Sequence, residues 1–206
     1  MATNGACTNG VPIYEDHNGA KQVPMYYTAT EFADHGGSYI YMDHSTSGST
    51  DQYAKDIVSV INEHPNQSIY LVGHSAGANA IVAGLSILLG EDGKGDLSRI
   101  AAVAMLDPFL TAGNGDGTLW PENWPALSNL GNQDNADALV AAGVPFWVGN
   151  SSGDLEPKSF PRSFQPRSDA VPYFSNDNHF QLAVDIDALK LIIQFFANPS
   201  SHQTTP

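Results

Sequence analysis

The stretch that most constrains the fold of this chain lies near its middle, from Tyr70 to Asn79. Residues 69–72 are apolar or strand-favouring, and they lead into the pentapeptide Gly-His-Ser-Ala-Gly at 73–77. An apolar segment with helical spacing follows at once. The stretch therefore predicts a strand, a sharp turn with Ser75 at a solvent-facing apex, and a helix.

Ser75 in such a turn would adopt a strained backbone conformation, and the glycines two residues before and after it would let neighbouring backbone approach closely. The hydroxyl would then project above the sheet edge, and the N–H of Ala76 would point to where an oxyanion forms. This arrangement is a nucleophile elbow. The alternative is a plain strand-to-helix turn with an unreactive serine. The choice between these two depends on whether the chain also supplies a base and an acid for Ser75.

Strands and helices alternate along the rest of the chain. This alternation predicts an α/β fold in which a mostly parallel, doubly wound sheet of about six strands carries helices on both faces. A length of 206 residues fits a single domain over residues 1–206. Strands are expected at 11–14, 38–42, 69–72, 100–106, 144–148 and 170–174, with helices at about 50–64, 80–89, 135–142 and after His179. The last helix should bury Leu182, Ile186, Leu189, Ile193 and Phe196 on one face.

Four residues with catalytic chemistry each follow a predicted strand, namely Ser75, Asp107, Asp154 and His179. Because reacting groups gather at the carboxyl ends of parallel strands, we expect such residues to meet at one sheet edge. A serine hydroxyl needs a neutral imidazole to take its proton, and the imidazolium needs a fixed anion. Ser75, His179 and one aspartate could supply these three groups.

These features resemble the α/β-hydrolase superfamily in its small lipase and esterase form. The resemblance rests on the elbow, on the run 145–149 leading to Asp154, and on His179 before the last helix, in the order Ser, Asp, His. It implies a minimal form of the fold without its first two strands. It also implies a catalytic triad of Ser75, Asp154 and His179, with an oxyanion hole formed by Ala76 and by Asn18 or Gly19.

Either of two aspartates, Asp154 or Asp107, could be the acid of the triad. Asp154 has the spacing that the family uses most often, whereas some lipases place the acid where Asp107 lies. The Asp107-Pro108 turn is also a common non-catalytic feature. His74 is expected to pack under the elbow and not to act as the base.

An excursion without clear periodicity spans about 108–134 and could form a small lid, and a frayed tail begins at about 198. The candidate walls of an acyl pocket are Trp120, Trp124, Phe160 and Phe164.

The formal charge of −14, with only 8 basic residues, argues against nucleic-acid partners. No segment offers the roughly 20 apolar residues that span a bilayer, and no cofactor or metal site is predicted. The expected function is therefore a serine hydrolase that cleaves carboxylic esters through an acyl-enzyme, with a small molecule as substrate. A thioesterase or acyltransferase with the same triad and a non-catalytic ligand-binding protein are the alternatives. The sequence leaves the oligomeric state open and favours a secreted protein over a cytoplasmic one.

Overall fold

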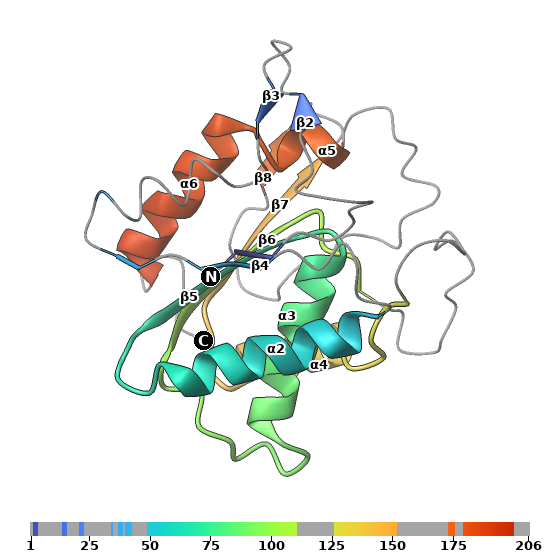
Figure 1. The fold of residues 1–206 in the computed structure, drawn as a ribbon, viewed down its shortest axis with the longest axis vertical. Helices are drawn as coiled ribbons and strands as arrows, with labels where there is room; N and C mark the ends of the chain where they lie inside the picture. The colour runs from blue at the N-terminus through green and yellow to red at the C-terminus, as the bar shows by residue number, and fades with distance from the viewer. Residues whose placement is uncertain are drawn as a thin grey trace.

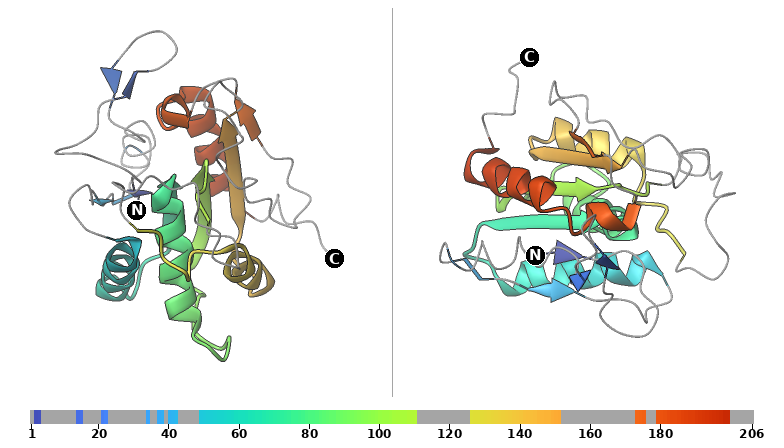
Figure 2. Two further views of the ribbon diagram at one scale, coloured as in Figure 1. Left: turned by 90° about the vertical axis from the view of Figure 1, so that its right-hand side faces the viewer. Right: turned by 90° about the horizontal axis from the view of Figure 1, so that it is seen from above.

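The computed structural model describes residues 49–110, 126–151, 173–175 and 179–199, together with short pieces of the first 42 residues. Its centre is formed by the strands β5 (Ile69–His74), β6 (Ile100–Leu106) and β7 (Phe146–Ser151), which pair in parallel. Figures 1 and 2 show β6 and β7 side by side. The helices are α2 (Thr50–Glu63), α3 (Ala76–Leu89), α4 (Gln133–Ala141), α5 (His179–Leu182) and α6 (Ile186–Ala197).

Shorter strands extend this sheet on both sides. The order is β4-β1-β5-β6-β7-β8, in which β1 is Ala2–Thr3, β4 is Tyr41–Met42 and β8 is Tyr173–Ser175, and every pairing is parallel. The strands β2 (Tyr14–Glu15) and β3 (Lys21–Gln22) form a separate antiparallel pair. The prediction of an α/β fold with a parallel sheet is confirmed, whereas β1 was not predicted.

Side chains of the central strands alternate between two hydrophobic cores, as the two-residue period of a strand requires. On β6, Val103 and Met105 belong to the core shared with α2, α3 and α4, whereas Ala102 and Leu106 belong to the core shared with α6. Figure 1 shows α2, α3 and α4 on one side of the sheet and α5 and α6 on the other. The strands are apolar on both faces because both faces are covered by helices.

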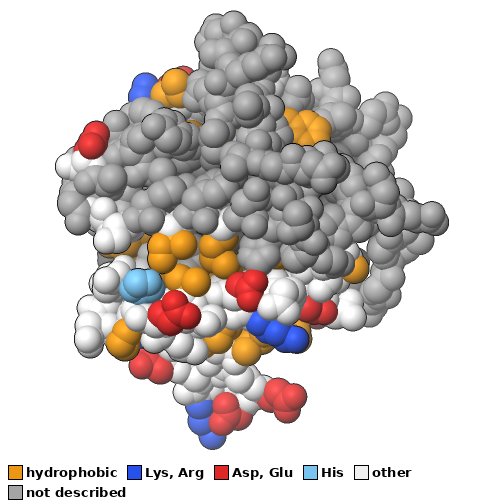
Figure 3. All heavy atoms as spheres, viewed as in Figure 1, with side chains coloured by type: hydrophobic (Ala, Val, Ile, Leu, Met, Phe, Trp, Pro, Cys, Tyr) orange, Lys and Arg blue, Asp and Glu red, His pale blue; other side chains and the backbone are white. Residues whose placement is uncertain are grey.

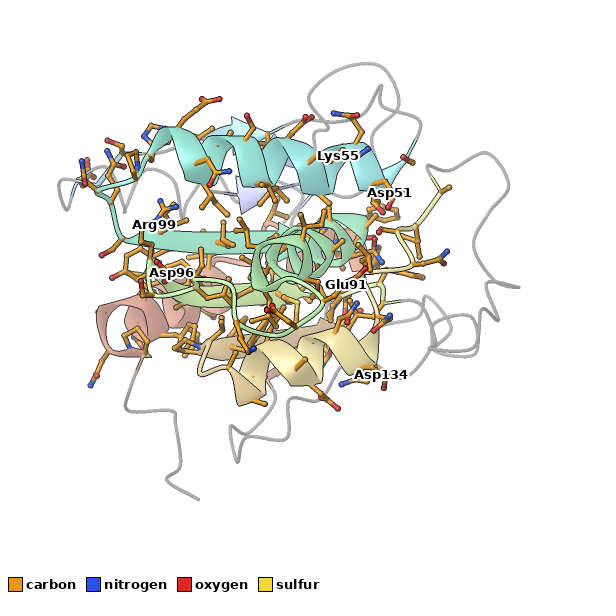
Figure 4. All side chains as sticks on the ribbon, turned by 90° about the horizontal axis from the view of Figure 1, so that it is seen from below. Asp51, Lys55, Glu91, Asp96, Arg99 and Asp134 are labelled. Atoms are coloured by element: carbon orange, nitrogen blue, oxygen red, sulfur yellow. The ribbon has the colours of Figure 1, made fainter. Side chains whose placement is uncertain are left out.

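The helices begin at the end of the sheet where the strands finish. Asp51 and Asp134, in the first turns of α2 and α4, lie at one end of the molecule in Figure 4, and Arg99 lies at the other. Arg99 Nη1 donates to the carbonyls of Ile61 (2.8 Å) and His64 (2.9 Å). The guanidinium thus satisfies carbonyl groups at the C-terminal end of α2, where the helix dipole favours a cation.

The predicted apolar face of the last helix is partly wrong. The chain breaks after α5, and α6 restarts at Asp185, whose side chain accepts a hydrogen bond from the N–H of Asp187. This break shifts the helical phase, so that Ile186 is 38% exposed. The buried residues of α6 are Ala188, Leu189, Ile192, Phe195 and Phe196.

On the face of the molecule in Figure 3, the coloured basic side chains are few and lie among acidic ones. No helix in the described part of the chain has the length and hydrophobicity needed to cross a membrane.

Candidate active site

The turn between β5 and α3 has the backbone of a nucleophile elbow. Ser75 has φ 57° and ψ −125°, a conformation that a residue with a Cβ rarely adopts. Two hydrogen bonds hold it there: the N–H of Ser75 donates to Leu106 O (3.0 Å), and the N–H of Ala78 donates to Ser75 O (3.0 Å). A Cβ on Gly73 would lie 2.9 Å from the backbone nitrogen of Ala78, so the elbow requires glycine there.

Ser75 is buried, at 1% exposure, and the expected solvent-facing apex is therefore wrong. The segment that leaves β6 contacts Ser75. Its Phe109 is buried, and the N–H of Phe109 donates to the carbonyl of Ser75 at 3.2 Å. Among the described residues, Ser75 Oγ has no hydrogen-bond partner. A buried hydroxyl without a partner is costly in a purely structural role, which favours a functional role for Ser75.

Asp107 follows β6 directly and also has a positive φ, 42°. Its N–H donates to Gly149 O at 2.8 Å, and its Oδ1 accepts from the N–H of Ser151 at 2.6 Å. Both partners lie on the neighbouring strand β7. The pairing of β6 with β7 thus holds the carboxylate in place through Oδ1. The second oxygen, Oδ2, contacts a different part of the chain.

That second oxygen meets His179. His179 Nδ1 lies 3.1 Å from Asp107 Oδ2, and the imidazole is almost completely buried. Because a carboxylate can only accept, Nδ1 carries the proton, and Nε2 is the ring nitrogen left to act as a base. Asp107, the second choice from sequence, is therefore the aspartate that pairs with His179, whereas Asp154 lies outside the described residues.

Two opposing effects act on Asp107. Burial raises the pKa of its carboxyl, but the hydrogen bond and charge of His179, together with the bonds from Ser151, outweigh burial and leave this pKa below its ordinary value. The site therefore favours an ionised carboxylate beside the imidazole.

His74 packs against the same imidazole. It is buried, its Nε2 lies 2.8 Å from the carbonyl oxygen of His179, and the two rings lie 4.5 Å apart at an interplanar angle of 35°. Its burial agrees with the prediction that it packs inside the protein. The contact with the backbone of His179 was not foreseen, since nothing in the sequence brings residues 105 positions apart together.

Asn79, one turn into α3, fastens a distant segment to the elbow helix. Its side-chain nitrogen donates to the carbonyls of Gly131 (2.7 Å) and Ser128 (3.2 Å). Its oxygen accepts from the Thr50 hydroxyl at 2.6 Å and from the N–H of Ser128 at 3.0 Å. The segment 128–131 is thereby held beside the start of α3.

Solved structures give an independent comparison for this architecture. A candidate carboxylesterase from Lactobacillus plantarum matches with a TM-score of 0.51 and 13% identity, covering 98% of this chain and 86% of its own. The chain has the α/β-hydrolase fold. No protein-family model and no curated protein sequence matches it.

Two other solved structures are similar to this chain at lower TM-scores. A pyrethroid hydrolase matches at 11% identity and a TM-score of 0.49, covering 97% of this chain and 98% of its own. Human thioesterase 2 matches at 12% identity and a TM-score of 0.47, covering 99% and 97%. At sequence identities this low, structural similarity indicates a shared fold alone.

In this fold, the structure brings Ser75, Ala76, Asp107 and His179 to the carboxyl end of the sheet. Ala76 is the first residue of α3. The remaining predicted site residues lie outside the described part of the chain: Asn18, Gly19, Trp120, Trp124, Asp154, Phe160 and Phe164. In the described part, no three His, Cys, Asp or Glu side chains gather in a way that could hold a metal ion.

Proposed function

We propose that this protein is a serine hydrolase that cleaves carboxylic esters through an acyl-enzyme, with Ser75 as nucleophile, His179 as base and Asp107 as acid. The observation that carries the proposal is the 3.1 Å contact between His179 Nδ1 and Asp107 Oδ2 beside a strained, buried serine. A plain structural turn would need neither the strain nor the oriented imidazole.

In the first half-reaction, Ser75 Oγ attacks the ester carbonyl while His179 Nε2 takes its proton. Asp107 holds the Nδ1–H tautomer and offsets the charge of the imidazolium. The Ala76 N–H, at the start of α3, is the proposed donor to the oxyanion. The imidazolium then protonates the leaving alcohol as its bond to the acyl carbon breaks. In the second half-reaction, water repeats these steps and releases the acid.

The decisive test uses nitrophenyl esters and a fluorophosphonate probe on the purified protein. Wild type is expected to release nitrophenol and to take up the probe. Ser75→Ala should lose both while unfolding at an unchanged temperature, because its hydroxyl makes no hydrogen bond with any described residue. Labelling at another serine in Ser75→Ala would refute the assignment.

The choice of acid is tested by a matched pair of variants. Asp107→Asn should lower turnover by a factor on the order of 10⁴, because the amide favours the wrong imidazole tautomer. Asp154→Asn should retain most of the turnover. A collapse in Asp154→Asn beside near-normal Asp107→Asn would return the role to Asp154.

The acyl donor and acceptor are tested with the same protein. An acyl-chain-length series of nitrophenyl esters, run beside the corresponding thioesters and with added alcohol acceptors, would separate an esterase from a thioesterase or an acyltransferase. We expect hydrolysis of the oxygen esters to be the fastest reaction. Probe uptake without turnover on any of these substrates would indicate a ligand-binding protein.

A further inference from the structure

His74 connects the nucleophile to the base through a short path. It is the residue before Ser75, and its Nε2 lies 2.8 Å from the carbonyl oxygen of His179. Since a carbonyl can only accept, His74 Nε2 carries the proton and donates it. The backbone of the elbow is thereby joined to the backbone of His179 by one side chain.

The two contacts of His179 restrain different parts of the residue. Asp107 fixes the ring through Nδ1 at 3.1 Å, whereas His74 fixes the main chain through the carbonyl and lies against the ring at 4.5 Å. Together they restrain both the position and the rotation of the imidazole. A base that must receive a proton from Ser75 depends on such restraint, since a misplacement of about 1 Å can cost on the order of 10²-fold in rate.

His74 is also suited to remain uncharged beside the base. Burial, followed by the charge of His179, lowers the pKa of His74 to about 3, although Asp107 and the bond to the His179 carbonyl oppose this shift. A neutral ring does not repel the imidazolium that forms on His179 during the reaction. Its own hydrogen bond to a carbonyl also excludes His74 Nε2 as a proton acceptor.

We propose that His74 is a positioning residue that sets the distance between base and nucleophile by donating Nε2–H to the His179 carbonyl. This inference rests on the proposed function for its kinetic consequence. The hydrogen bond and the tautomer do not depend on that function, and they can be tested separately.

The kinetic test uses variants that separate the donor from the ring. In His74→Gln, the amide nitrogen lies the same number of bonds from Cα as Nε2, so a donor is kept without the ring. His74→Phe keeps a ring without a donor, and His74→Leu is a second donor-free variant in case His74→Phe does not fold. The donor-free variants should lose on the order of 10²-fold in kcat with little change in KM. His74→Gln should recover most of that loss.

Other outcomes would overturn the inference. If His74 only fills space, His74→Phe would be tolerated and His74→Gln would be the damaged variant. If His74 were the base, all three variants would be inactive. If wild type is active and His74→Phe is equally active, the positioning role is refuted and the proposed function stands. If wild type shows neither turnover nor probe uptake, the proposed function itself is refuted.

The second measurement needs no activity. Ring-nitrogen NMR of the wild-type protein should show His74 as the neutral Nε2–H tautomer throughout pH 5 to 8. Titration of His74 in that range, or the Nδ1–H tautomer, would overturn the inference whatever the enzyme assay shows.

Discussion

Acid should destabilise this protein through His74. In the folded chain the pKa of His74 is lowered to about 3, chiefly by burial, from its ordinary value of 6.5. Between these two values the unfolded chain binds a proton at this position and the folded chain does not. The contribution is therefore fully present above pH 6.5 and is lost progressively as the pH falls toward 3.

The size of this effect follows from linkage. Each pH unit within the window is worth about 1.4 kcal/mol of unfolding free energy for one such group. From pH 7 to pH 6.5 the unfolded chain is only partly protonated at this position, so this interval contributes little. Between pH 7 and pH 5, His74 alone should therefore lower the free energy of unfolding by about 2 kcal/mol. Because the pKa of His74 in the folded chain lies well below 5, this loss depends mainly on the pKa of His74 in the unfolded chain.

The assay is urea unfolding of wild type, His74→Phe and His74→Gln at pH 7, 6 and 5, followed by circular dichroism. Neither variant can titrate at position 74, so both should lose about 2 kcal/mol less than wild type over this range. Titrating groups that do not interact with position 74 are common to the three proteins and cancel in the comparison. Equal losses in wild type and both variants would refute the claim that His74 is neutral in the folded state.

Further predictions concern the elbow and the contacts that support it. Gly73→Ala should abolish probe labelling and cost about 1 to 3 kcal/mol, because the new Cβ would lie 2.9 Å from the α3 backbone; labelling and urea unfolding check both effects. Asn79→Ala leaves several buried groups unpaired and should cost on the order of 3 kcal/mol in urea unfolding. Arg99→Gln should lower stability by about 1 to 2 kcal/mol without changing kcat, because it uncaps α2 at the far end of the sheet. Below pH 4, Asp107→Asn should lose less stability than wild type, because the lowered pKa of the Asp107 carboxyl gives a contribution that is present above 3.8 and lost below it.

The local pattern of the sequence was sufficient for the elbow and for β6. The apolar run Ile100–Leu106 has the same bounds in the structure, because a strand buried on both faces consists of continuous apolar residues. β7 was predicted at 144–148 but extends from Phe146 to Ser151. Its polar end is stabilised by pairing with β8, which a local apolar pattern does not reveal.

This difference at β7 also explains why the choice between the acids was uncertain. Both aspartates follow a strand, and spacing along the chain favoured Asp154. The longer β7 brings the N–H of Ser151 within 2.6 Å of Asp107, and α5 brings His179 to the other oxygen of the same carboxylate. These contacts depend on the register between strands, and a single sequence does not specify that register.

The backbone bonds at the site have a consequence for how the protein loses activity. Ser75 N–H donates to the end of β6, and Asp107 N–H donates to β7, so both residues continue the hydrogen-bonded ladder of the central sheet. Amide hydrogens at these two positions should exchange with solvent as slowly as those of the core, since they open only when the sheet opens. Heat inactivation should then coincide with global unfolding, without a folded but inactive intermediate.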